Sequence, residues 1–338
     1  MRTADSAVGS DYAELLRRVK QAGLLNRRPW HAAGRIVLIV VLFAAGWTGF
    51  AVLGESWWQV AVAAFLALVF TQIEFLGHDA GHRQLFRSRR ANDLIGLLSG
   101  NLSIGLSFGW WMDKHNRHHA HPNHEERDPD VRAGAIVFNR TAGRARRGLA
   151  GVFAHGQAFL FFPLLTFEAW SLHVASVRGL LRRGARRRPL EMVLFGIHVF
   201  GYLAAVLIVL SPWQAVVFVA VHQGLFGLYL GCSFAPNHKG MPTPDKIDNL
   251  DFLRRQVLTA RNVRGGRVVD FALGGLNYQI EHHLFPSMPR SNLRHAQPVV
   301  RAFCADRGVL YHESPLFASN AEALRHLHAV GRADATER

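Results

Sequence analysis

The sequence predicts an all-α integral membrane protein, in which four transmembrane helices form two hairpins beneath a cytoplasmic helical cap. Two observations carry this prediction. Four apolar stretches are long enough to cross a bilayer, and the basic residues are confined to segments that would lie on one side of it. A third observation, the clustering of histidines in the same segments, bears on what the cap holds.

The predicted spans cover about residues 36–53, 58–77, 192–210 and 213–235. Helices of about 18–23 residues are roughly 27–35 Å long and match a hydrocarbon core of about 30 Å. The segment from Gly54 to Trp57 separates the first two spans, and Ser211-Pro212 separates the last two. The spans therefore form two tight hairpins, with tryptophans at both turns as in an aromatic interface belt.

The distribution of charge gives the orientation. The chain has 338 residues and a formal charge of +15, yet 49% of its residues are hydrophobic and 19% are charged, which excludes a basic nucleic-acid binder and a disordered tail. All 39 Lys and Arg residues fall within 1–35, 77–191 and 236–338, and the positive-inside rule places these segments in the cytoplasm. We expect a multi-pass protein of a bacterial plasma membrane, with arginine-rich runs at 144–147 and 182–188 that meet lipid headgroups, not nucleic acid.

The two cysteines cannot form a disulfide framework, and residues 1–35 lack the apolar core of a signal peptide.

Two further apolar stretches are expected not to span the membrane. Leu94–Met112 is rich in glycine and polar residues, and Leu149–His173 contains Pro163 and Glu168. If both crossed, the basic residues between them would face the wrong side, so we expect helices in or near the interface. The predicted organisation is a cytoplasmic N-terminal segment (1–35), a membrane domain (36–305) and a cytoplasmic C-terminal tail (306–338).

Three histidine clusters, within 78–82, 115–119 and 279–283, lie on the predicted cytoplasmic side, and a further histidine follows the last span. Histidines three or four residues apart share one face of a helix. The metal-ligand candidates are His78, His82, His115, His118, His119, His238, His282 and His283. Eight imidazoles are too many for one tetrahedral zinc site, so a dimetal site fits better, although imidazole alone does not distinguish iron, zinc, copper and nickel.

For the other histidines we weigh structural roles against metal binding. His198 and His222 lie within spans, where a hydrogen bond between helices explains them as well as a function does. His121 and His124 are weaker ligand candidates. The following are expected at interfaces or helix ends: His31, His155, His173, His295, His312, His326 and His328.

The clusters resemble the three histidine boxes of the integral-membrane fatty acid desaturase family, His-x-x-x-His, His-x-x-His-His and Gln-or-His-x-x-His-His, which occur here in that order. The resemblance covers roughly residues 30–305. The third box begins with Gln279, which is similar to the acyl-lipid and front-end (linoleoyl-CoA-type) branch. Members of that branch often carry a fused b-type cytochrome domain with a His-Pro-Gly-Gly motif, which is absent from this sequence.

This resemblance implies a desaturase that introduces a cis double bond into an acyl-CoA or acyl-lipid. It implies two non-haem iron ions held by the eight histidines above, with His238 as the ligand that follows the last span. Dioxygen is the implied co-substrate, and a separate ferredoxin or b-type cytochrome with its reductase is the implied electron donor. An acyl chain is expected to enter between the spans with its headgroup at the basic surface, and Glu74, one turn before His78, is expected to face this region.

Residues beside the boxes are expected to orient the ligands. Gln279 is expected to approach a metal through water or to support a ligand, and Asn237 is a weaker candidate of the same kind. Asp79 and Glu281, which lie inside boxes, are the preferred carboxylates. Asp113, Asp128 and Asp130 are further candidates by proximity, and for every carboxylate a salt bridge to a nearby Arg or Lys is an equal alternative.

Two other functions stay open at this point. Another histidine-box di-iron oxygenase, such as a fatty acyl or sphingolipid hydroxylase, would use the same centre with a different outcome. A metal transporter or sensor is disfavoured, because its ligands should line a path through the spans, and the clustered histidines lie at one face.

Overall fold

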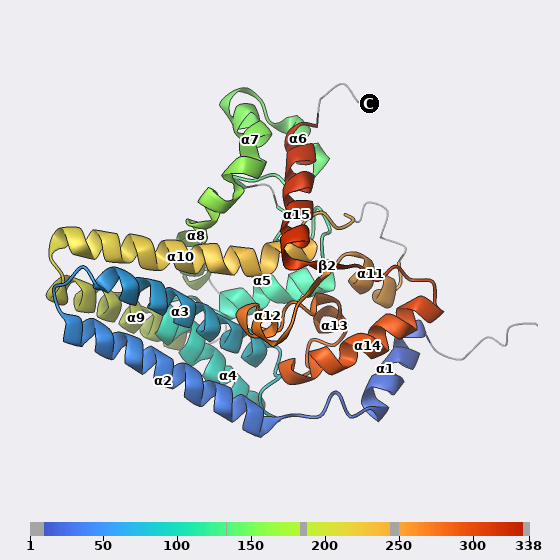
Figure 1. Cartoon of the computed structure of the whole chain (residues 1–338), viewed down its shortest axis with the longest axis horizontal. Coiled ribbons are helices and arrows are strands. Elements are labelled where there is room, and N and C mark those ends of the chain that lie inside the picture. The colour runs from blue at the N-terminus through green and yellow to red at the C-terminus, as the bar shows by residue number, and fades with distance from the viewer. Residues whose placement is uncertain (1–9, 133, 183–187, 244–249, 334–338) are drawn as a thin grey trace, which may run out of the picture.

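The computed structural model describes residues 10–132, 134–182, 188–243 and 250–333, and these are predominantly helical (Figure 1). The elements are α1 (Asp11–Gln21), α2 (Pro29–Leu53), α3 (Gln59–Gly81), α4 (Arg89–Leu97), the π-helix η1 (Leu98–Ile104), α5 (Phe108–Ala120), α6 (Arg140–Ala145), α7 (Gly148–Leu165), α8 (Glu168–Leu181), α9 (Arg188–Val209), α10 (Pro212–His238), α11 (Phe252–Leu258), β1 (Asn262–Arg264), α12 (Arg267–Ala272), α13 (Gln279–Leu284), α14 (Arg290–Asp306), β2 (Glu313–Pro315) and α15 (Leu316–Gly331).

The axes of four long apolar helices, α2, α3, α9 and α10, are roughly aligned with one another (Figure 1). These helices coincide with the four predicted spans. Helix α2 ends where Gly54 adopts a φ of 55°, a conformation that disfavours residues with a Cβ. Helix α10 begins with Pro212, whose missing N–H is not needed in the first turn. By length and composition, the described residues contain five helices able to cross a membrane, and the fifth is α7.

Helix α7 has a different direction from the other four and stands steeply against them in Figure 1. One side of α7 packs on α15, where Gln157 donates to the carbonyl oxygen of Leu327 at 2.8 Å. Its other side is open, with Leu149 90% and Phe159 77% exposed. The segment 306–338, predicted as a tail, thus contains β2 and a helix that covers α7.

The apolar stretch Leu94–Met112 is divided among α4, η1 and α5 and forms no continuous span. The chain turns at Gly105, which has a φ of 67° and where a Cβ would lie 2.4 Å from Cδ2 of His198. The next turn is held by Glu191 of α9, whose Oε2 accepts from Oγ of Ser107 at 2.7 Å and from N of Gly109 at 3.1 Å. This anchor sets the start of α5, the helix of the second histidine box.

At one end of the four long helices lie α1 and α11 to α14 (Figure 1). Of these elements, α1, α11, α13 and α14 share a core of buried side chains that includes Leu15, Leu253 and Phe303. The hydroxyl of Tyr12 in α1 donates to the carbonyl oxygen of Leu284 at 3.1 Å, at the end of α13. Strand β1 pairs with β2 in parallel, with Asn262 opposite Glu313.

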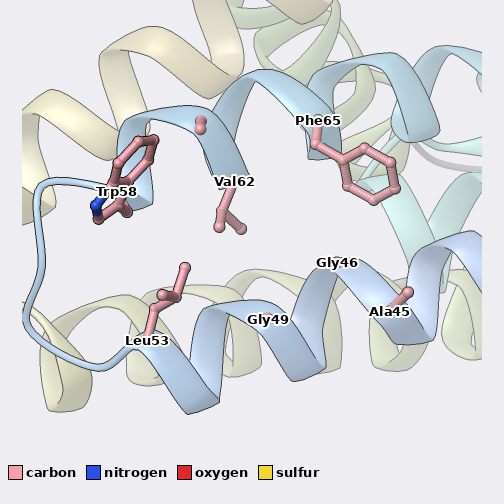
Figure 2. Close-up of a pocket in the computed structure, with 8 residues that line it drawn as sticks. Ala45, Gly46, Gly49, Leu53, Trp58, Val62 and Phe65 are labelled. Carbon is pink, nitrogen blue, oxygen red and sulfur yellow. The ribbon is translucent and has the colours of Figure 1, made fainter.

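A cavity of about 400 Å³ lies between α2 and α3 near their connecting turn. Figure 2 shows Leu53 and Val62 pointing toward one another across it, and the remaining lining is apolar as well. The histidine box of α3 begins at His78, thirteen residues beyond the last lining residue, Phe65, or about 20 Å along a helix. This cavity is therefore separate from the histidines.

Candidate metal centre

Four segments that are far apart in sequence bring their histidines together. Helix α3 carries His78 and is followed directly by His82, α5 carries the second box, α13 carries the third, and α10 ends at His238. Helix α5 starts at a fixed point because Ser107 caps it by accepting from N of Trp110. Before α13 the chain turns at Gly274 and Gly275, both with positive φ, and a Cβ on Gly274 would lie 2.5 Å from the ring of Phe75.

The imidazoles form two groups. In the first group, His78, His82, His115 and His282 each offer a ring nitrogen, and these atoms lie within 4.8 Å of one another. In the second group, His118, His238 and His283 meet the same criterion. His119 lies between the groups, with its Nε2 at 3.1 Å from Nε2 of His115 and its ring stacked at 4.3 Å on that of His283. All eight predicted ligands are thus placed together.

The donor set fits a pair of metal ions. Several ring nitrogens are buried without a hydrogen-bond partner, which is unfavourable unless something else binds them. They are both nitrogens of His78, both nitrogens of His282, Nδ1 of His119 and Nε2 of His283. Burial, followed by the field of neighbouring imidazoles, lowers the pKa of His82, His115, His119, His282 and His283 well below the usual value. Neutral imidazole is the form that binds metals.

Every ring of the second group is oriented by a hydrogen bond to its Nδ1 atom. His118 meets Oδ2 of Asp128, His238 meets the carbonyl oxygen of Thr259, and His283 meets Oε1 of Gln256, each at 2.9 Å. With Nδ1 engaged in this way, Nε2 is the ring nitrogen left for the centre, and Nε2 of His283 has no hydrogen-bond partner. Burial lowers the pKa of His118, but Asp128 and Asp130 more than reverse this, so its pKa is raised.

Gln256 and Thr259 were not predicted. They lie in and just after α11, between the last span and the third box, and nothing in their spacing relates them to a histidine. The weak signal available is the recurrence of polar side chains at 256, 259, 261 and 262, all of which are buried.

Asp79 supports the first group from behind. Its Oδ1 lies 3.5 Å from Nδ1 of His78, and its Oδ2 lies 2.5 Å from Nη1 of Arg35 and 3.2 Å from Nε of Arg290. Arg290 also donates to the carbonyl oxygen of Phe75 at 3.0 Å. Of the two arrangements expected for this carboxylate, salt bridging is therefore present, while its approach to His78 is too long for a hydrogen bond.

Glu281 faces away from both groups. Its oxygens accept from the hydroxyl of Tyr311 and from Nδ2 of Asn262, both at 2.7 Å. Burial outweighs these hydrogen bonds and raises the pKa of Glu281 to about 7. Because Asn262 also accepts from N of Ile280, the carboxyl group fastens α13 to β1.

Gln279 lies at the second group, with Nε2 at 2.9 Å from Nε2 of His238. Asn237 supports it by donating to its Oε1 at 3.2 Å. Of the other acidic candidates, Asp130 pairs with Lys114 at 2.5 Å and reaches His118 at 3.5 Å, whereas Asp113 pairs with Arg117 on the surface.

The remaining histidines stay outside the two groups. His121 and His124 face one another with ring centroids 6.1 Å apart. Within the long helices, Nδ1 of His222 lies 2.9 Å from the hydroxyl of Tyr202, and His198 hydrogen-bonds to the carbonyl oxygen of Leu102. His173 of α8 hydrogen-bonds to the carbonyl oxygen of Gly105. These contacts are of the helix-to-helix kind expected for polar residues within spans.

Comparison with known proteins finds the fatty acid desaturase family and individual desaturases. The model of the family described as fatty acid desaturase matches residues 55–315. The chain is 33% identical over 299 residues to the acyl-lipid (9-3)-desaturase of Physcomitrium patens, covering 82% of this chain and 54% of that protein. It is 28% identical over 343 residues to the Delta(8)-fatty-acid desaturase of Helianthus annuus, covering 96% and 74%. It is also 28% identical over 347 residues to the Delta 8-(E)-sphingolipid desaturase of Kluyveromyces lactis, covering 96% and 60%.

Proposed function

Because this chain belongs to the fatty acid desaturase family, we propose that it is a membrane oxidoreductase that removes two hydrogens from adjacent methylenes of an acyl chain and leaves a cis double bond. The convergence of eight imidazoles, seven of them in two groups and His119 between the groups, carries the proposal. The acyl chain is borne by CoA or by a membrane lipid. A separate ferredoxin or b-type cytochrome with its reductase supplies the two electrons, and dioxygen is the oxidant.

We propose that two iron ions occupy the centre, one in each imidazole group, with His119 between them. The unpartnered nitrogens of His78, His282 and His283 support this assignment. When bound, an iron pair activates dioxygen for attack on unactivated C–H bonds, which no acid–base pair of side chains achieves. Gln279 and Asn237 belong to the second group as supporting residues.

The protein's own contribution is to orient and enclose the ligands. The rings of the second group are fixed by Asp128, Thr259 and Gln256. In the first group, Oδ1 of Asp79 lies 3.5 Å from Nδ1 of His78. His78, His282 and His283 are at most 1% exposed, which keeps bulk water from the reacting atoms. Electrostatic interactions inside the site are stronger for that reason.

We propose a topology of four spans, which is supported by the segments that meet at the histidines. Two segments in contact on one side of a membrane must be separated by an even number of spans. His118 of α5 lies beside His238 at the end of α10, with ring centroids 4.7 Å apart, and α7, α9 and α10 separate the two. One of these three helices therefore does not cross. Because α9 and α10 form a hairpin and α7 stands against their direction in Figure 1, we propose that α7 lies along the interface.

The positive-inside rule supports a cytoplasmic position for the histidines. The relatives described above are all from eukaryotes, so they lend no support to a bacterial plasma membrane, which stays a prediction from the sequence.

The acyl products of expressing cells test the proposed function. In a host that lacks its own desaturase, the wild-type chain is expected to yield a new unsaturated acyl group, and His118→Ala is expected to yield none. His155→Ala, on the exposed part of α7, is the matched control and should keep the product. Unchanged product in His118→Ala contradicts the proposal, and a product heavier by one oxygen indicates a hydroxylase instead.

Metal analysis of the purified protein tests the cofactor separately. Two iron ions per chain are expected. One zinc ion without iron would overturn the assignment of an oxygen-activating centre.

A further inference from the structure

The two imidazole groups are supported in different ways. Every ring of the second group has a hydrogen bond from its Nδ1 atom to a residue outside the centre. Among the described residues, the rings of the first group form hydrogen bonds with other histidines alone. Asp79 approaches Nδ1 of His78 to no less than 3.5 Å, and both nitrogens of His282 are buried without a partner. The first group must therefore be oriented by packing.

One indole packs against three of the four rings of the first group. Trp111 of α5 is stacked on His115, with ring centroids 4.4 Å apart and an angle of 19° between the planes. The rings of His78 and His82 meet the indole at steep angles, with centroids 5.5 Å and 6.4 Å away. The fourth ring, His282, packs on His78 at 4.7 Å. Because aromatic pairs prefer stacked and edge-to-face contacts, the indole favours one orientation of each ring that it meets.

The indole is itself confined by its neighbours. A Cβ on Gly81, which lies between the two histidines of the first box, would be 2.6 Å from Cζ3 of Trp111, so an alanine here would displace the ring. The ring of Phe108 is nearly parallel to the indole, at 6.5 Å and 11°. Residues 108, 111 and 115 are three and four positions apart and share one face of α5, so the three rings form a stack along the helix.

We propose that Trp111 is a positioning residue for the first imidazole group and sets the affinity of that group for its metal ion. The inference rests on the proposed pair of metal ions. Residues that orient ligand rings typically change metal affinity about 10–100-fold, and in the second group these residues form hydrogen bonds. In the first group the same task falls to packing against one indole. The two ions thus depend on different side chains outside the ligand set.

Titration of the metal-free protein with Co²⁺, a divalent ion that imidazole also binds, is the first test. The wild type should bind two ions per chain. In Trp111→Leu the Kd of one ion should rise about 10–100-fold, and that of the other should stay the same. Trp111→Phe, which keeps an aromatic ring on His115, should recover most of the lost affinity. Two unchanged affinities in Trp111→Leu would overturn the proposal, and so would an equal loss of both, which would indicate a general disturbance.

Trp110→Leu is the matched control, because it makes the same substitution at the next residue of α5. The ring of Trp110 lies 6.0 Å from Nζ of Lys114, and its Cβ would be 2.6 Å from a Cβ placed on Gly179 of α8. This side chain faces another helix, so both Co²⁺ affinities should equal those of the wild type. A loss in Trp110→Leu as large as that in Trp111→Leu would overturn the specific role of Trp111.

The emission of Trp111 identifies which ion is affected. Co²⁺ quenches an indole close to it, and the difference in emission between wild type and Trp111→Phe isolates this indole. The difference should be quenched as the first group fills. Gln256→Leu removes a hydrogen bond from the second group, so the Co²⁺ concentration that gives half of this quenching should stay the same. Absence of quenching, or a shift of its midpoint in Gln256→Leu, would overturn the assignment to the first group.

Gly81→Ala tests the same contact without removing the indole. The added Cβ should displace the ring of Trp111 and raise the Kd of the same ion about 10-fold. Gly77→Ala, one turn earlier in α3, is the control, because its Cβ would lie 3.5 Å from Cβ of Ser99, an ordinary contact. It should leave both affinities unchanged. Unchanged affinities in Gly81→Ala would contradict the proposal even if Trp111→Leu does not fold.

These measurements separate the role of Trp111 from the proposed function. A wild-type chain that binds no metal refutes the proposed centre, and one that binds two ions but forms no double bond refutes the proposed reaction. A wild type that forms the double bond, beside a Trp111→Leu variant with the same two affinities, refutes the role of Trp111 alone.

Discussion

Nδ1 of His283 lies 2.9 Å from Oε1 of Gln256, and Nε2 of the same glutamine donates to the carbonyl oxygen of His119 at 3.0 Å. A single side chain from α11 thus fixes one histidine of the second box and one of the third. Because a glutamine holds both contacts at once, it sets the spacing between α5 and α13.

Gln256→Leu should therefore weaken metal binding at the second imidazole group. Partners of metal-bound histidines are typically worth about 10–100-fold in affinity, and we expect a loss of that size. Competition with a chelator, followed by metal analysis, measures it. Gln256→Glu keeps an acceptor for His283 and should lose less. Equal affinity in Gln256→Leu and wild type would show that the ring is held by packing alone.

Removal of the metals should destabilise the fold around the histidines. A ligand that binds the native state alone stabilises it by about 2.7 kcal/mol at a concentration 100 times its Kd. We expect chelator treatment to lower the thermal midpoint of the wild type in detergent, and to lower that of His118→Ala by less, because this variant keeps only the first imidazole group intact. A midpoint that is insensitive to the chelator in the wild type would contradict a structural contribution of the metals.

Asp79→Asn should destabilise even the metal-free protein. The substitution leaves Arg35 and Arg290 buried together without a carboxylate, and breaking a buried ion pair in this way costs about 3–5 kcal/mol. The control is Asp113→Asn, which breaks a surface pair with Arg117 and should cost no more than about 1 kcal/mol. The free energies of unfolding of both variants, measured without metal, test this difference. Equal destabilisation of the two variants would refute it.

Acid should weaken the attachment of α15 through Glu322. Burial raises the pKa of this residue, but hydrogen bonds from His312 and Ser314 and the charge of Arg261 more than reverse this, so its pKa is lowered. A carboxyl group with a lowered folded-state pKa stabilises the fold above its unfolded value of about 4.5, and this stabilisation is lost as pH falls through the folded pKa. Unfolding midpoints measured from pH 7 down to pH 3 should fall more steeply in wild type than in Glu322→Gln. Parallel pH profiles would contradict this.

Arg261→Met should loosen the end of α10. The buried guanidinium donates to the carbonyl oxygens of Pro236, Lys239 and Ser319 and pairs with Glu322 at 2.5 Å. Loss of these contacts removes the link between α15 and the turn that follows His238, so both thermal stability and metal content should fall. Arg325→Met, on the exposed side of α15, is the control and should keep both.

The sequence predicts the spans and the histidine boxes well, because both depend on local rules. An apolar run of sufficient length is visible directly, and the i, i+4 spacing of His78 and His82 places both on one face of a helix. His238, expected beside the boxes from its depth after the last span, lies with His118 and His283. The division of Leu94–Met112 into three short elements agrees with its glycine content.

Contacts between distant short elements could not be predicted. Thr259 and Gln256 reach histidines through a loop and α11, and Arg35 of α2 meets Arg290 of α14 at Asp79. Glu281 shows the limit of reasoning by proximity. Successive residues of a helix point about 100° apart, so when His282 and His283 face the first and second groups, Glu281 is turned toward β1.

The hydrogen bond from Tyr12 to Leu284 joins residues that are 272 positions apart. During synthesis α1 leaves the ribosome long before α13 exists, while the helices between them enter the membrane. The pocket for the metals is therefore completed by the last of its histidines to be translated, and the helix that carries this histidine is held by one of the first helices made. We expect metal insertion to follow translation. Until the third box has been synthesised, we expect α1 to lie on the membrane surface without its packing partner.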